Sequence, residues 1–183
     1  PNILKIKKFF NKKEINCLIN CAAYSERGEN IVYNDKNFYN EVKGVFGSSV
    51  LLTETLIKNL RVRGGIIINV GSIWGIVAPD FRTYLDLNNA PTPVMSIGKA
   101  GIMQYTKFLA ARESINNIRV NNLIPGFFPR QGTVNRDDYI NEIKRRTMLN
   151  KIGKLEYLIP AIDFLLSDKN KFYTGQNLVI DGG

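Results

Sequence analysis

Short apolar strands alternate with long amphipathic helices along most of the chain, and this order restricts the possible folds more than any other feature. Helices are predicted over Asn37–Val62 and Ser96–Ser114, because apolar residues recur there mostly every three or four positions. Strands are predicted over four short apolar segments: Asn16–Ala23, Ile66–Val70, Arg119–Ile124 and Leu178–Ile180. Strands that alternate with helices at this spacing predict a parallel sheet with right-handed crossovers.

Two further helices are expected near the end of the chain, over Asp137–Met148 and Leu155–Leu166. The length of 183 residues and the hydrophobic content of 44% fit one soluble globular domain. We therefore expect residues 1–183 to form a single α/β domain. The chain begins at Pro1 instead of a methionine, which suggests a processed product or a piece of a longer protein.

Composition excludes several classes of function. The net charge is +9, but the cations are scattered and no nucleic-acid motif accompanies them, so nucleic acid is not an expected partner. The densest basic groups are Lys5–Lys13 and Lys144–Lys154, and we interpret the second as a solvated helix face. No apolar run approaches a membrane span, and no signal peptide is visible. Two cysteines and no histidine predict neither a disulfide framework nor a metal site, and they favour a cytoplasmic location.

Five short motifs follow one another along these elements. Asn20-Cys21-Ala22-Ala23 ends the first strand, Asn69-Val70-Gly71-Ser72 ends the second, Lys99 lies in the second long helix, and Asn121 to Gly126 ends the third strand. The last motif runs from Thr174-Gly175-Gln176 to Asp181-Gly182-Gly183. In this order the motifs resemble the short-chain dehydrogenase/reductase family. The resemblance implies a Rossmann-like parallel sheet with helices on both faces, NAD or NADP as the cofactor, and an alcohol or carbonyl compound as the substrate.

The resemblance also implies roles for individual residues. Ser72 would orient the substrate carbonyl, although a serine at a strand end can equally be a turn cap. Lys99 would bind the nicotinamide ribose and lower the pKa of a tyrosine four residues earlier, although a helix lysine is often simply solvated. Cofactor contacts are implied for six residues: Asn20, Ala22, Ala23, Lys99, Pro125 and Gly126. Family members commonly assemble through their two long helices, so a homo-oligomer is expected.

Three features depart from the family pattern. Met95 stands where the family has its catalytic tyrosine, and Tyr84 is an alternative proton donor without a lysine in register. Glu41 replaces an asparagine that would hold a proton-relay water. The chain contains no Gly-x-x-x-Gly-x-Gly turn, which in the family binds the pyrophosphate. We therefore expect an incomplete fold without the first strand–helix units, with Asn16–Asn20 at an open sheet edge.

Two hypotheses about function follow. The chain is either part of a nicotinamide-dependent oxidoreductase, or a catalytically inactive relative that acts as a binding or assembly partner. In the first case Arg82 or Arg130 is available for an anionic group of the substrate. A thioether at position 95 can neither donate nor accept the proton that the reaction requires, so whether the chain is an enzyme stays open.

Overall fold

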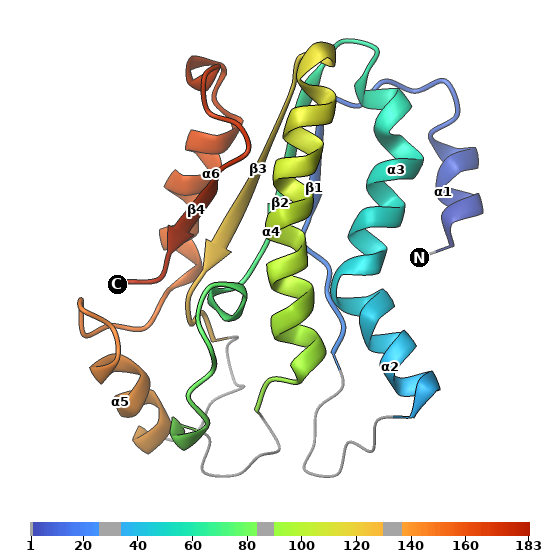
Figure 1. Cartoon of the computed structure of the whole chain (residues 1–183). Coiled ribbons are helices and arrows are strands. Elements are labelled where there is room, and N and C mark those ends of the chain that lie inside the picture. The colour runs from blue at the N-terminus through green and yellow to red at the C-terminus, as the bar shows by residue number, and fades with distance from the viewer. Residues whose placement is uncertain (1, 26–33, 84–89, 130–136) are drawn as a thin grey trace.

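A computed structural model describes the whole chain except residues 1, 26–33, 84–89 and 130–136 (Figure 1). Its sheet has four parallel strands in the order β1-β2-β3-β4. The strands are β1 (Cys17–Asn20), β2 (Gly65–Val70), β3 (Ile118–Pro125) and β4 (Asn177–Ile180). The predicted parallel α/β sheet is thus confirmed, and in the described part of the chain β1 is an edge strand.

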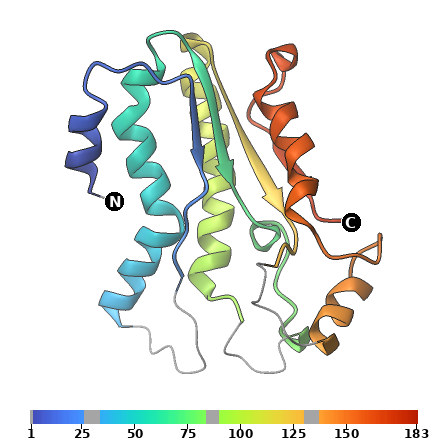
Figure 2. The same ribbon diagram turned by 180° about the vertical axis from the view of Figure 1, so that it is seen from behind.

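The long helices lie on one face of this sheet. They are α2 (Asp35–Val42), α3 (Ser48–Leu60) and α4 (Pro93–Glu113), whereas α5 (Asp137–Arg145) and α6 (Ile159–Leu166) follow β3. A further helix, α1 (Ile3–Phe9), packs beside α3 and was not expected from the sequence (Figures 1 and 2). The start of α1 could have been predicted, because asparagine is a preferred helix N-cap and the Asn2 side chain accepts the main-chain N–H of Lys5.

The predicted helix Asn37–Val62 is not one regular helix. A π-helical turn over Lys43–Gly47 separates α2 from α3 and adds backbone to the helix without a break in the chain direction. The second long helix begins three residues earlier than predicted, because Thr92 caps it and Pro93 occupies its first turn. Both differences come from local backbone geometry, which hydrophobic spacing does not report.

The two last helices are also shorter than predicted. The helix expected over Asp137–Met148 ends at Arg145, where both the N–H and the hydroxyl of Thr147 bind the carbonyl of Lys144. The helix expected over Leu155–Leu166 opens with a 3-10 turn over Leu155–Leu158 before α6 begins. Pro160 lies in the first turn of α6, which suits its fixed φ.

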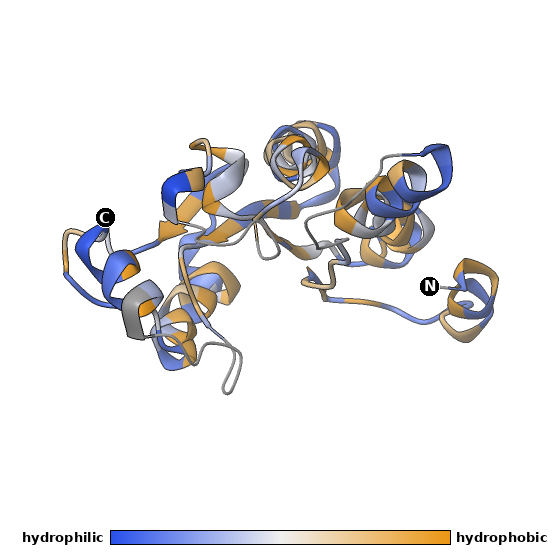
Figure 3. Cartoon of the chain, turned by 90° about the horizontal axis from the view of Figure 1, so that it is seen from below, coloured by the Kyte–Doolittle hydropathy of each residue, from blue (hydrophilic) through white to orange (hydrophobic). Residues whose placement is uncertain are grey.

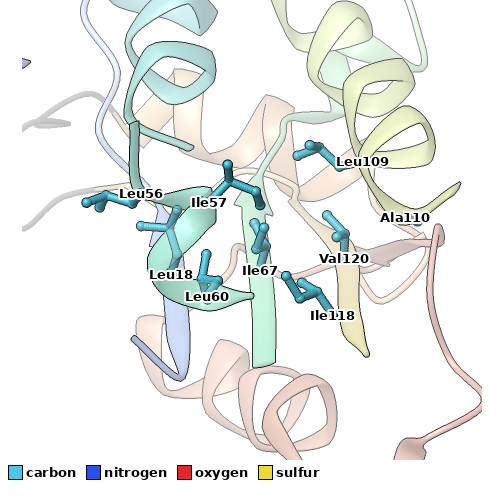
Figure 4. Close-up of a cluster of buried hydrophobic side chains, with 9 residues drawn as sticks. All are labelled: Leu18, Leu56, Ile57, Leu60, Ile67, Leu109, Ala110, Ile118 and Val120. Carbon is cyan, nitrogen blue, oxygen red and sulfur yellow. The ribbon is translucent and has the colours of Figure 1, made fainter. Parts of the chain in front are cut away.

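Buried side chains pack on both faces of the sheet. Helices lie on both sides of the sheet in Figure 3, so the predicted helices on both faces are confirmed. Alternation along β2 sends Ile67 toward α3 and α4, and sends Ile68 toward α6. The cluster under α3 and α4 contains nine buried residues, shown in Figure 4: Leu18, Leu56, Ile57, Leu60, Ile67, Leu109, Ala110, Ile118 and Val120. On the α6 side of β1, Ile19 is 46% exposed, which agrees with an edge that no described element covers.

A buried amide ladder joins the sheet to the two long helices. The Asn20 amide donates to Thr53 on α3 at 2.9 Å and to the Asn69 side-chain oxygen at 2.8 Å. Asn69 in turn donates to Thr106 on α4 at 2.9 Å. Each of these side chains is buried, and the hydrogen bonds satisfy the amide donors, while the Asn20 side-chain oxygen has no partner in the described structure. The hydrogen bonds fix the lateral position of the helices on the sheet.

Two glycines of α4 provide a matched test of helix packing. A Cβ at Gly98 would lie 2.7 Å from Val45 in the π-helical turn, whereas a Cβ at Gly101 would meet nothing within 4 Å. We expect Gly101→Ala to raise the free energy of unfolding by about 0.5–1 kcal/mol through helix propensity. Gly98→Ala gains the same propensity but is expected to lose about 1–3 kcal/mol to overpacking. Urea unfolding of both variants measures the difference, and equal effects would contradict close packing at Gly98.

Candidate functional site

The residues predicted for the site come together at the carboxyl ends of the strands. Ser72 follows β2 and Gly126 follows β3, while Asn20 is the last residue of β1. Lys99 reaches the same edge from α4, because its ammonium donates to the main-chain carbonyl of Val70 at 2.8 Å. This edge is where parallel α/β sheets bind their ligands.

Lys99 is not a solvated helix lysine. It is only 7% exposed, and burial lowers the pKa of its ammonium group from the usual value. The turn Ile73–Gly75 packs against α4 at this point, and a Cβ on Gly75 would approach the main-chain carbon of Lys99 to 2.7 Å. A side chain at position 75 would therefore push the turn away from Lys99. The turn thus fixes the main chain at Lys99, and the Val70 carbonyl positions its ammonium group.

Ser72 is a turn cap with an unused proton. Its hydroxyl oxygen accepts the main-chain N–H of Trp74 at 3.3 Å and thereby starts the 3-10 turn. Within the described part of the chain, its hydroxyl proton has no acceptor. The cap interpretation is thus correct, and it leaves Ser72 able to donate a hydrogen bond to a carbonyl oxygen.

The residues predicted to contact the cofactor differ in accessibility. Asn20 is 6% exposed and its amide belongs to the buried ladder, whereas Ala22 and Ala23 are exposed just beyond β1. Pro125 pairs with Ile180 of β4, and the N–H of Gly126 donates to the Ile180 carbonyl at 2.9 Å. Their roles toward a cofactor stay predictions, and for Asn20 the structure shows a second, structural role.

Met95 lies in the first turn of α4, one helical turn before Lys99 and on the same side of the helix. Its side chain is partly exposed. Tyr84, the alternative proton donor, lies outside the described residues. Among these positions, the one with the right spacing to Lys99 therefore has a thioether instead of a phenol.

Glu41 is fully buried between α2 and the start of α4. Its carboxylate accepts hydrogen bonds from the hydroxyls of Thr92 and Ser25, both at 2.5 Å. Thr92 also accepts the N–H of Met95 at 3.1 Å, so one residue links Glu41 to the turn that contains position 95. Sequence reasoning missed Thr92, although a threonine directly before a helix-starting proline is a helix N-cap signal.

An apolar hollow of about 320 Å³ opens beside Ser72. Its lining residues come from the segment after β2, the end of β3, α5 and the residues after β4. They include the apolar Trp74, Ile76, Phe127 and Ile143, and the carboxylate of Asp181. Arg146 also lines this hollow, but Asp80 and Glu142 both pair with it. The hollow therefore contains no uncompensated charge from Arg146.

Of the two arginines proposed for an anionic substrate group, the structure describes Arg82 only. Arg82 does not line the hollow, its side chain is 87% exposed, and it pairs with Asp80 at 2.7 Å. Together Arg82 and Arg146 hold the pKa of the Asp80 carboxyl far below its usual value. Arg130 lies outside the described residues. Over the same described ranges, no cluster of three potential metal ligands occurs, and no helix is long and apolar enough to cross a membrane.

A parallel sheet with helices on both faces and a serine–lysine pair at its carboxyl edge defines a Rossmann-like α/β domain. A family model described as enoyl-(acyl carrier protein) reductase matches residues 5–183. The chain belongs to the short-chain dehydrogenase/reductase family, and this confirms the resemblance in the sequence.

Similar proteins support this membership. The chain is 34% identical to the post-translational flagellin modification protein A of Campylobacter coli, over 75% of this chain and 53% of that protein. It is 35% identical to the 3-oxoacyl-(acyl-carrier-protein) reductase FabG of Thermotoga maritima, over 78% of this chain and 53% of that protein. A short-chain dehydrogenase from Leptospira borgpetersenii with bound NAD⁺ superposes with a TM-score of 0.86 at 33% identity, covering 100% of this chain and 71% of that one. The aligned regions thus span about half the length of these two curated relatives.

Proposed function

We propose that the chain provides the substrate side of a nicotinamide-dependent oxidoreductase that acts on an alcohol or carbonyl group, and that it has lost the usual proton donor. The observation that supports this most directly is the pair formed by Ser72 and Lys99 at the carboxyl edge of the sheet. Lys99 is buried and positioned by the Val70 carbonyl, and Ser72 keeps a free hydroxyl proton within the described structure.

These residues fit one part of NAD or NADP. A buried ammonium group suits the ribose hydroxyls next to the nicotinamide, and Ala22 and Ala23 are exposed beside it at the end of β1. When bound, the nicotinamide supplies or accepts a hydride. The chain's own part is to orient the substrate oxygen through the Ser72 hydroxyl and to exclude water with the apolar walls of the adjacent hollow.

The remaining part of the cofactor has no matching residues in this chain. The sequence contains no glycine-rich turn for a pyrophosphate, and β1 is an edge strand in the described sheet. We therefore infer that NAD or NADP is held at its nicotinamide end only. Such a partial site loses the contacts between the phosphates and a helix N-terminus that ordinarily supply much of the affinity.

The hollow beside Ser72 supports an uncharged group on the substrate. Trp74, Ile76, Phe127 and Ile143 provide apolar walls, and Arg146 is neutralised by two carboxylates. An anionic group would have to compete with Asp80 and Glu142 for the guanidinium. An uncharged alcohol or ketone meets no such competition, so it fits the hollow better than a carboxylate or phosphate does.

The proposal predicts weak cofactor binding. In isothermal titration calorimetry, NADH and NADPH are each expected to bind this chain with a Kd of about 1 mM or weaker, because the phosphate contacts are missing. Lys99→Met is expected to abolish the residual heat, while Lys107→Met on the same helix leaves it unchanged. A micromolar Kd would overturn the partial site, and an unchanged signal in Lys99→Met would overturn the role of Lys99.

A second candidate is an inactive relative that acts as an assembly partner. Exposed apolar side chains on the two long helices favour it, since Leu51 on α3 is 46% exposed and Ile97 on α4 is 67% exposed. The helices through which a homo-oligomer is expected thus keep apolar outer faces. The candidates differ in one measurable respect: an assembly partner without a working site gains no hydride transfer from Met95→Tyr.

A further inference from the structure

A second hollow, of about 670 Å³, lies on the other side of α5 from the apolar one. Ile143, Arg146 and Thr147 face the hollow beside Ser72, whereas Lys144 and Arg145 face the second hollow. We call it the basic hollow. It has eight lining residues: Asn141, Lys144, Arg145, Asn150, Lys151, Ile152, Lys154 and Tyr157.

The segment after α5 is fixed so that its cations face those of the helix. The Thr147 hydroxyl oxygen accepts the N–H of Lys151 at 3.0 Å. Its proton lies within hydrogen-bond distance of two carbonyls, those of Lys144 and Lys151. Asn150 adopts a left-handed φ of 50°, which asparagine tolerates and which turns the chain back toward the helix. The N–H of Gly153 then donates to the Phe127 carbonyl at 2.9 Å. The walls of the basic hollow are therefore formed before any ligand binds.

The charge of the basic hollow is largely uncompensated. Arg145 pairs with Glu142 at 3.4 Å, but Lys144, Lys151 and Lys154 form no ion pair with any residue that the structure describes. In the neighbouring hollow, by contrast, Arg146 has two carboxylate partners. Like charges that converge without counter-charges repel one another, and a bound anion would relieve this repulsion.

Helix electrostatics explain only half of this arrangement. Lys144 and Arg145 lie in the last turn of α5, where cations interact favourably with the helix dipole. Lys151 and Lys154 are not part of that helix, yet they line the same hollow. Interpreting residues 144–154 as a solvated helix face is therefore incomplete, because the second pair of cations comes from a separately folded segment.

We propose that the basic hollow binds the diphosphate or triphosphate group of a small molecule. Its volume of about 670 Å³ leaves room for a diphosphate or triphosphate group, since small-ligand sites measure roughly 300–1,000 Å³. Lysine ammonium groups and one arginine can neutralise several phosphate charges. Asn141 and Asn150 add amide donors, and the half-exposed ring of Tyr157 provides an apolar wall beside them. The site is independent of the proposed hydride transfer, because it shares no lining residue with the hollow beside Ser72.

Calorimetric titration with sodium tripolyphosphate tests the proposal without any nicotinamide cofactor. We expect binding to one site per chain that persists at about 0.15 M NaCl, where long-range attraction is screened beyond about 8 Å. The triple variant Lys144→Ala/Lys151→Ala/Lys154→Ala is expected to weaken binding at least ~10-fold, a loss of about 1.4 kcal/mol. Its matched control is Lys5→Ala/Lys7→Ala/Lys8→Ala in α1, which removes the same charge elsewhere and is expected to change the Kd less than ~2-fold.

Three outcomes would overturn the proposal. The first is no measurable binding by the unchanged chain. The second is equal weakening in both triple variants, which would mean that net charge alone attracts the anion. The third is a single-stranded oligonucleotide that binds the same residues more tightly with increasing length, which would assign them to a polymer. Because no outcome depends on NADH or NADPH, failure here leaves the proposed oxidoreductase function unaffected.

Discussion

Met95→Tyr is expected to raise the rate of hydride transfer by roughly 10²–10⁴-fold, the usual contribution of a general acid or base. The phenol would stand one helical turn before Lys99, and the buried ammonium would lower its pKa. The rate is followed by NADPH or NADH absorbance, with cyclohexanone and ethyl acetoacetate as uncharged probes of the apolar hollow. Both proteins are compared at the same cofactor concentration, so weak cofactor binding affects them equally.

The double variant Met95→Tyr/Lys99→Met is the control for this gain. Without the ammonium, the phenol keeps an ordinary pKa near 10 and most of the gain is expected to disappear. Met95→Phe adds an aromatic ring without a hydroxyl and is expected to gain nothing. Equal rates for the tyrosine and phenylalanine variants would show that proton transfer does not limit this chain, and would favour the assembly partner instead.

Glu113→Ala is expected to lower the free energy of unfolding by about 3 kcal/mol, because it breaks a buried ion-pair cluster. The Glu113 side chain is fully buried at the end of α4. It accepts two hydrogen bonds from Arg61, one from Arg112 and one from Asn116, at 2.6–3.0 Å. Chemical denaturation measures the loss, and Glu113→Gln, which keeps the side-chain volume, serves if the alanine variant does not fold.

Glu54→Ala is the matched control, since its partly exposed carboxylate also pairs with Arg112. Removing this carboxylate is expected to cost less than about 1 kcal/mol because water replaces the lost contact.

A second check of the Glu113 cluster uses pH. Hydrogen bonds from Arg61 lower the pKa of Glu113 from 4.5 to about 2, so its contribution is complete above pH 4.5 and is lost as the pH falls toward 2. In Glu113→Ala the free energy of unfolding should depend less on pH in this range. An unchanged pH dependence would contradict the assigned contribution of Glu113.

The order of strands and helices was predictable because buried positions appear in the sequence as apolar residues at regular spacing. Ile66–Val70 and Arg119–Ile124 were found as strands within one residue at their beginnings and ends, since continuous apolar runs mark strands with two covered faces. The gathering of Ser72, Lys99 and Gly126 at one edge followed from the family resemblance and is what the fold shows. The family membership of the chain was predicted in the same way.

Contacts between distant polar residues were not predictable from periodicity. Glu41 and Thr92 are 51 positions apart, and nothing in either segment indicates that they share a hydrogen bond. The prediction that the basic residues 144–154 share one helix face was wrong for Lys151 and Lys154 for a related reason, since α5 ends at Arg145. Lys151 and Lys154 face Lys144 only because Thr147 and Asn150 reverse the chain, and that reversal depends on one hydroxyl and one left-handed backbone angle.

The π-helical turn Lys43–Gly47 has a consequence for how this sequence tolerates length changes. Each residue in a helix turns the following side chains by about 100°. The turn sets α2 so that Glu41 meets Thr92, while α3 places Thr53 on Asn20. Deleting a single residue there would keep Glu41, Thr53 and their partners in the sequence, but it would rotate α2 relative to α3 by about 100° and break one of these two contacts. The segment therefore sets the rotation of α2 relative to α3 about the helix axis. Its length is under stricter constraint than its composition.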